Sequence, residues 1–246
     1  MHRPLKESCT LQLMNFKMID PYVVNRAFWR SCSFMLGAVM QRTFKEDAGM
    51  FLHSFPPPNS KFFNWCCYTL ILMWIYSCLL VKSGSFIHDI SLNEKNWTPT
   101  EQDLRTLGAE MIKLSSQDQK IERLEVSHEI ALEMFKDNPF KREQLPNISN
   151  QNNGIVTLYR IADHIDISKG PMVASSKFVG KVNITSSHKV STSDDPCNLY
   201  RVQGIALPVG FTMSYFAFNI LVDRARKLIL TLIVIVHCVH WKSCQI

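Results

Sequence analysis

The sequence lacks the short motifs that mark most small metal-binding and redox proteins. Its eight cysteines include no pair in the CxxC spacing that zinc knuckles and thiol–disulfide centres use. We therefore interpret them as reduced and structural, and we expect no metal and no cofactor. The 27 lysines and arginines are scattered and form no dense basic run. The net charge of +6 is thus compatible with an RNA neighbour but does not require one.

The first 13 residues also lack a targeting signal. They contain no apolar run for secretion, and too few arginines and serines for a mitochondrial presequence. Residues 5–16 alternate apolar and polar side chains, as a half-buried strand does. Because this strand has no partner upstream, we expect it to be the end of a small domain whose beginning is absent.

Four segments have helical patterns. Residues 21–44 carry apolar side chains at helical spacing. The segment Thr98-Pro99-Thr100-Glu101 predicts a helix start with an N-cap, a first-turn proline and a capping-box glutamate. Residues 127–137 and 212–227 are expected to form two further helices.

Runs typical of strands cover residues 121–126, 155–167, 178–184 and 199–207, with turn residues between them. With the helices, these runs predict an α+β fold in which helices pack on an antiparallel sheet. A chain of 246 residues with 46% hydrophobic content can bury such a core as one large domain or two small ones.

Two apolar segments do not fit this pattern. Residues 62–81 carry no charge and as a helix would span about 30 Å, close to the thickness of a bilayer core. Residues 228–239 reach only about 18 Å at helical rise, which is too short to cross. The first segment therefore leaves a single-pass membrane protein open as an alternative.

Three stretches together resemble the second additional domain of threonyl- and alanyl-tRNA synthetases. They are NRAFWRSCSFMLGAVMQRTFK at 25–45, KSGSFIHDISL at 82–92 and LYRIADHIDISKGPMV at 158–173. The resemblance implies an editing-like fold for residues 19–227, interrupted by an insert at 61–81. It also implies that residues 1–18 are the remnant of a TGS domain, a small nucleotide-binding module.

In the editing relatives, two histidines four residues apart on the first helix converge with a cysteine and a later histidine. Residues four apart share one helix face, so the four groups can hold a metal or activate a water. Carried over to this sequence, the four positions are Arg30, Phe34, Ser168 and Met172. None of them is a histidine or a cysteine, so we expect no catalytic activity.

A scaffold without its catalytic groups resembles a family of mitochondrial large-subunit ribosomal proteins. FWRSC at 28–32, WTPT at 97–100 and LYRVQGIALP at 199–208 carry this resemblance. It implies a structural role in the ribosome of the mitochondrial matrix, with ribosomal proteins and rRNA as partners and no small-molecule substrate. The family has no counterpart of residues 61–81 or 228–246. Their composition suggests that they are translated intron sequence, and a comparison of genomic sequence with spliced cDNA would test this.

Several basic residues near the former editing positions could meet rRNA phosphates, and a solvated rim is the alternative. They are Arg26, Arg30, Arg42, Lys169, Lys177 and Lys181. His88 and His164 each adjoin an aspartate, but we interpret them as surface or hydrogen-bonded strand residues, and Ser187-His188 as loop. A hydrolase that edits aminoacyl-tRNA in trans is the enzymatic alternative. A membrane anchor at residues 62–81 is disfavoured, because it would place two parts of one folded domain on opposite sides of a membrane.

Overall fold

The computed structural model describes residues 8, 14–16, 22–44, 48–55, 85–94, 96–190 and 198–226. The segments 61–81 and 228–246, expected to be apolar additions, lie outside the described residues, as does most of the strand expected at 5–16. Residues 8 and 14–16 are described and are not in a strand.

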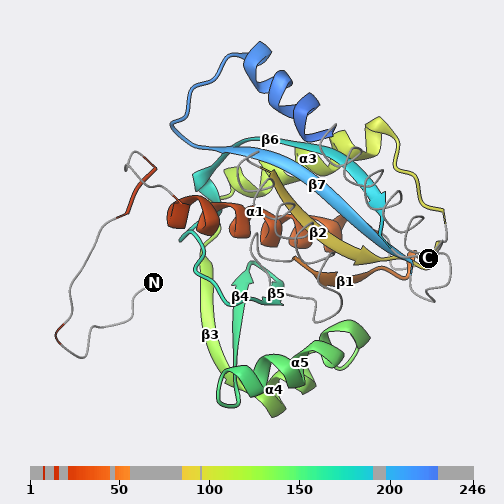
Figure 1. Ribbon diagram of the computed structural model, residues 1–246, viewed down its shortest axis with the longest axis vertical. Helices are drawn as coiled ribbons and strands as arrows, with labels where there is room; N and C mark the ends of the chain where they lie inside the picture. Colours follow the sequence, from red (N-terminus) through yellow and green to blue (C-terminus); the bar gives the residue numbers. More distant parts are fainter. Residues whose placement is uncertain are drawn as a thin grey trace, which may run out of the picture.

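The larger sheet contains four antiparallel strands in the order β1-β2-β7-β6. These are β1 (Phe51–Ser54), β2 (Ser85–Ser91), β6 (Val179–Lys189) and β7 (Leu199–Pro208). Two helices, α1 (Tyr22–Thr43) and α3 (Glu101–Ser116), cover one face and form the main core with it (Figure 1). Residues 215–226 form a further helix, which packs Phe218 and Val222 on Ile205 of β7.

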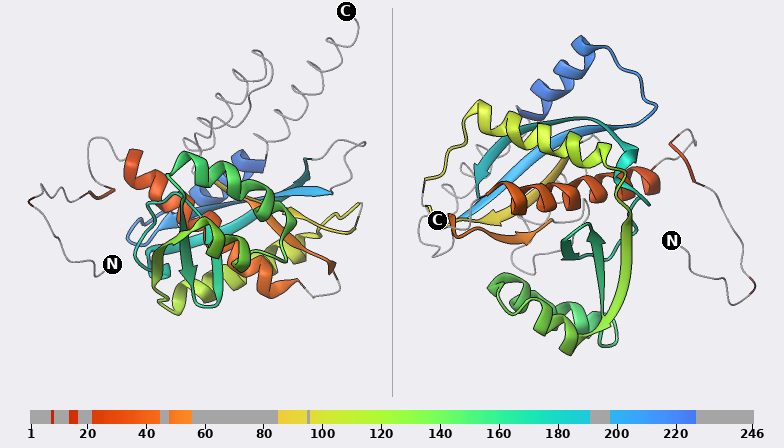
Figure 2. Two further views of the ribbon diagram at one scale, coloured as in Figure 1. Left: turned by 90° about the horizontal axis from the view of Figure 1, so that it is seen from below. Right: turned by 180° about the vertical axis from the view of Figure 1, so that it is seen from behind.

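A smaller unit lies below α1, in the lower half of Figure 1. Its three antiparallel strands, in the order β3-β4-β5, are β3 (Ile121–Ser127), β4 (Ile155–Ile161) and β5 (His164–Ile167). Helices α4 (His128–Met134) and α5 (Pro139–Gln151) pack on this sheet around Ala131, Leu145, Val156 and Leu158. Figure 2 shows the two sheets and the helices from below and from behind.

The α+β class with antiparallel sheets is confirmed, and so are the helices expected at 21–44 and 127–137. At the third helix the expected capping residues are wrong. Thr100 is the N-cap of α3, and Asp103 rather than Glu101 completes the capping box, because the N3 side chain is the one that reaches back to the N-cap amide. Pro99 therefore precedes the helix.

Other expectations need correction. The run 155–167 is a hairpin of β4 and β5 and not one strand, since Ala162 turns the chain with φ of 48°. Ser187 and His188 lie in β6 and not in a loop. Helix α5 was not expected, because Pro146 interrupts its pattern and only Lys141, Leu145 and Ser149 are buried along it. Strands β1 and β2 were not assigned either.

The described residues contain no helix that is long and apolar enough to cross a membrane.

Candidate functional site

Arg30 links α1 to the segment that follows β5. Its Nη1 donates to the carbonyl oxygens of Gly170 and Pro171, the latter at 3.1 Å. One residue along, the Ser31 hydroxyl accepts a hydrogen bond from the Val173 amide at 2.9 Å. Arg30 is 7% exposed, so its guanidinium serves the backbone of residues 170–171 and is not presented to solvent.

The other three positions carried over from the editing domains are also buried. Phe34 packs its ring 5.0 Å from the His164 ring. Met172 belongs to the same hydrophobic core as Phe34, and the Ser168 hydroxyl accepts from the Gly170 amide at 3.3 Å. The structure thus brings Arg30 and Ser168 to the same residue, Gly170, and places Phe34 and Met172 in one core.

These four side chains offer little acid–base chemistry. Burial and the charge of Arg26 lower the pKa of Arg30 from its ordinary value, but a guanidinium remains protonated in proteins at neutral pH. Phenylalanine and methionine carry no exchangeable proton. A water molecule would find no base among them.

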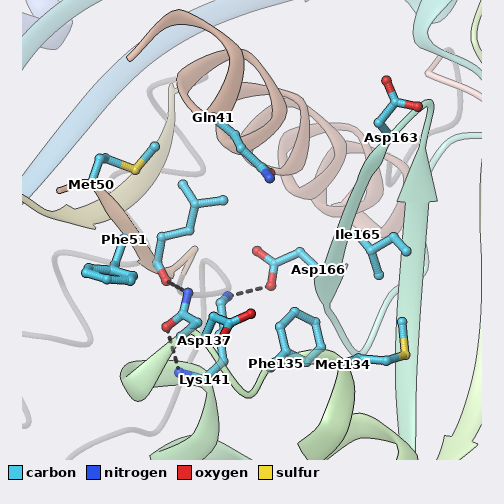
Figure 3. Close-up of a pocket in the computed structure, with 12 residues that line it drawn as sticks. Gln41, Met50, Phe51, Met134, Phe135, Asp137, Lys141, Asp163, Ile165 and Asp166 are labelled. Carbon is cyan, nitrogen blue, oxygen red and sulfur yellow. Dashed lines mark hydrogen bonds and ion pairs between the residues drawn. The ribbon is translucent and has the colours of Figure 1, made fainter. Parts of the chain in front are cut away.

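A polar cluster that the sequence reasoning missed lies next to these positions. Lys141 of α5 donates to Asp166 of β5, with 2.5 Å between Nζ and Oδ1, and both side chains are almost fully buried. They border a cavity of about 340 Å³ that Gln41 of α1 and Phe51 of β1 also line (Figure 3). The sequence held one indication of this cluster, because His164 and Asp166 are two residues apart in a strand-like run and therefore share one face.

Two buried histidines adjoin this pair. His88 Nδ1 lies 2.9 Å from the Ser33 carbonyl oxygen, and His164 Nδ1 lies 2.7 Å from Gln41 Oε1. Burial lowers the pKa of each imidazole to about 4, so both are neutral near pH 7. The Nε2 atoms of both rings and Oδ2 of Asp166 are buried without a partner.

This arrangement decides between the two interpretations of these histidines. Both are buried strand residues with one ring nitrogen hydrogen-bonded, and neither is a surface residue. In β5 the polar His164 and Asp166 are more buried than Ile165 and Ile167. No group of three or more histidine, cysteine, aspartate or glutamate side chains in the described part of the chain is arranged to hold a metal ion.

The basic residues considered for RNA contact differ in their availability. Arg30 is buried, as described above. Arg42 lies 3.6 Å from Asp163, and Lys177 lies 3.0 Å from Asp118, in exposed ion pairs. Lys169 is exposed. Lys181 donates to the Met213 carbonyl at 2.7 Å, and Arg26 lies over the Tyr22 ring at 5.4 Å.

The chain is similar to two groups of curated proteins. It is 53% identical over 227 residues to the large ribosomal subunit protein mL39 of Drosophila melanogaster, in an alignment that covers 92% of this chain and 62% of the relative. It is 31% identical over 211 residues to the cytoplasmic threonine–tRNA ligase 1 of Bos taurus, covering 84% of this chain and 24% of the ligase. The threonine–tRNA ligase of Thermotoga maritima is 35% identical over 106 residues, 43% of this chain.

No protein-family model matches the chain. The resemblance that the sequence motifs indicate, to threonyl-tRNA synthetases and to a large-subunit ribosomal protein, is nevertheless confirmed as sequence similarity. The chain spans about three fifths of the ribosomal relative and about a quarter of the bovine ligase.

Proposed function

We propose that this chain, with its similarity to a large ribosomal subunit protein, is a structural component of the mitochondrial large ribosomal subunit and has no catalytic activity. The observation that carries the proposal is the 53% identity to the Drosophila protein over 92% of this chain. We further propose that it works in the mitochondrial matrix, with ribosomal proteins as its neighbours.

The chemistry at the former editing positions supports a role without catalysis. Arg30 is tied to two backbone carbonyls, and Phe34 and Met172 are core residues. A hydrolytic site needs a base or a metal-bound water within reach of the scissile bond. Arg30, Phe34, Ser168 and Met172 supply neither, and we propose that they mark the place of a lost editing site.

We also propose the domain organisation that the resemblance implies. Residues 19–227 would form one editing-like unit that contains both sheets, interrupted at 61–81. Residues 1–18 would be a TGS remnant, and residues 228–246 an apolar tail. The alignment with the bovine ligase, which covers 84% of this chain, supports an editing-like ancestry.

Contacts with rRNA are proposed for the exposed cations. Lys169, Lys177 and Arg42 have side chains that reach solvent, and phosphate contacts need such access. Arg26 and Lys181 also remain candidates. The burial of Arg30 counts against it as a phosphate ligand.

Co-sedimentation tests the main proposal. The tagged full chain, expressed in cells whose mitochondria supply the ribosomes, should migrate with the large subunit on a salt-washed gradient. A built-in component stays bound under salt that releases proteins held to RNA by charge alone. Its absence from the large-subunit peak would count against the proposal.

A second candidate function is the hydrolysis of mischarged tRNA in trans. The similarity to threonine–tRNA ligases and the cavity beside Lys141 and Asp166 favour it. A deacylation assay with mischarged threonine tRNA separates the two functions. We expect no turnover above the uncatalysed rate, and turnover that a chelator abolishes would support the hydrolase.

A further inference from the structure

Exposed apolar side chains gather where β7 ends and the last described helix begins. We call this group the apolar patch. Its members and their exposed fractions are Phe178 42%, Val209 62%, Phe211 47%, Tyr215 78%, Phe216 76% and Ile220 50%.

These side chains lie on neighbouring pieces of backbone. The Val209 amide donates to the Phe178 carbonyl oxygen at 3.0 Å, which joins the end of β7 to the start of β6. Phe211 follows Val209 after one glycine, and its ring meets the Phe16 ring edge-on, with 5.8 Å between the ring centroids. The helix at 215–226 then rises at the top of Figure 1.

The buried face of this helix determines which side chains it exposes. Phe218, Val222 and Ala225 recur at helical spacing and are buried against Ile205 of β7. Phe216 and Ile220 therefore lie on the opposite face and point away from the sheet. Tyr215 is on the same side of the helix as Phe218 but belongs to its first turn, where it is 78% exposed. A helix with a single buried face normally carries charged or polar residues on the opposite one, and here that face carries Phe216 and Ile220 before it reaches Asp223 and Arg224.

Charge is missing from this region. From Val202 to Val222 the sequence contains no aspartate, glutamate, lysine or arginine over 21 residues. Its border carries the cations Lys177, Lys181 and Arg224. Two acids lie there as well, Asp223 beside Arg224 and Asp118, which pairs with Lys177 at 3.0 Å. Lys181 lies 5.9 Å from the Phe218 ring. An aromatic, uncharged centre with a charged border is the composition of a protein–protein interface.

We propose that the apolar patch is the docking surface for a neighbouring protein that presents an apolar strip flanked by aspartates or glutamates. The inference rests on the proposed ribosomal function and names one surface through which that function is exerted. The border holds three cations, Lys177, Lys181 and Arg224, against two acids, Asp118 and Asp223, and this excess of positive charge favours acidic flanks. Tyr215 and Phe216, the most exposed members, are the anchors, because aromatic residues dominate binding energy at such centres.

The same observations disfavour RNA as the occupant. Surfaces that stack unpaired bases combine aromatic side chains with cations that follow the phosphate backbone. The centre of the patch has no cation, and aliphatic Val209 and Ile220 offer no ring for stacking.

A double substitution tests the surface in the full chain. Tyr215→Ser with Phe216→Ser should lower the amount that co-sediments with the large subunit by at least about tenfold, since aromatic anchors carry most of the binding energy at the centre of an interface. The matched control is Leu124→Ser with Ile130→Ser, two comparably exposed residues of the smaller unit (60% and 52%), which should co-sediment like the unchanged chain. Circular dichroism of both variants checks that they fold.

The outcomes separate the two proposals. If the unchanged chain is absent from the large-subunit peak, the proposed function fails. If it is present and the folded Tyr215→Ser, Phe216→Ser variant sediments equally, only the docking surface is wrong.

A cross-link identifies the occupant without disturbing the fold. Replacing Phe216 by p-benzoylphenylalanine keeps an aromatic ring at one of the two anchors, and irradiation of the assembled subunit should join it to an apolar protein segment with acidic flanks. Adducts with rRNA, adducts with a second copy of this chain, or no adduct would each overturn the proposal.

Discussion

Lys141 on α5 and Asp166 on β5 form an ion pair whose side chains are 3% and 1% exposed, with Nζ 2.5 Å from Oδ1. Figure 3 shows the lysine directed at the carboxylate along the wall of the cavity. The pair joins the helical layer of the smaller unit to its edge strand. Burial raises the pKa of Asp166, but the charge of Lys141, the two neighbouring histidines and the hydrogen bond from Lys141 together bring it below its ordinary value.

Removing one member of this pair should destabilise the chain strongly. Lys141→Met leaves Asp166 buried without its counter-ion, and we expect a loss of about 3–5 kcal/mol in the free energy of unfolding, measured with urea. The double variant Lys141→Met, Asp166→Leu should recover most of that loss. Arg160→Met is the control, because its pair with Glu122 is more than half exposed and should cost less than about 1 kcal/mol. Equal losses for the two single variants would contradict the buried pair.

The stability of the chain should fall between pH 6.5 and pH 4. His88 and His164 have pKa values of about 4 when folded and about 6.5 when unfolded, so the unfolded chain takes up protons first as the pH falls. The stabilisation is complete above the unfolded value and is lost toward pH 4, by up to about 3 kcal/mol for each histidine.

Urea titrations at pH 7, 6, 5 and 4.5 measure this slope. His88→Gln with His164→Gln should flatten it. A residual slope of the same sign remains because burial also lowers the pKa values of His53 and His188. An unchanged slope in the double variant would refute the assignment.

Two helical glycines should respond in opposite ways to alanine. A Cβ at Gly37 of α1 would lie 2.6 Å from Cε1 of the buried His88, whereas a Cβ at Gly108 of α3 would meet nothing closer than the Ile184 amide nitrogen at 3.8 Å. We expect Gly37→Ala to cost about 1–3 kcal/mol through overpacking, and Gly108→Ala to stabilise by about 0.5–1 kcal/mol. Thermal unfolding compares them, and the same sign of change in both would contradict the packing of α1 on β2.

Arg30→Met should destabilise the chain, because it removes two hydrogen bonds that a buried guanidinium donates. The substitution removes the donors to the carbonyl oxygens of Gly170 and Pro171, and we expect a loss of about 2–3 kcal/mol, because the lost donor is charged and the acceptors are shielded from water. Lys169→Met, at an exposed neighbouring position, should change the stability by less than about 0.5 kcal/mol. An Arg30→Met variant as stable as the unchanged chain would show that the 170–171 segment does not depend on Arg30.

Part of the candidate site could be predicted from the sequence. Motif resemblance located Arg30, Phe34, Ser168 and Met172, because the spacing within a helix or a strand is local information. The partners of these residues could not be predicted. Arg30 and Gly170 are separated by 140 residues, and no pattern along the chain connects them. Lys141 escaped notice for the same reason, and also because α5 has no apolar stripe.

By itself, the sequence determined the local elements: α1 through its apolar spacing, the approximate start of α3 through the segment Thr98–Glu101, and the strands β3, β6 and β7 through strand-like runs between turn residues. These features depend on neighbours within a few residues, so local physical chemistry suffices to predict them. Tertiary structure alone decided which face of each element is covered. It buried His164 and Asp166 in preference to Ile165, and it left Tyr215 and Phe216 exposed, because burial depends on which distant segment packs against a face.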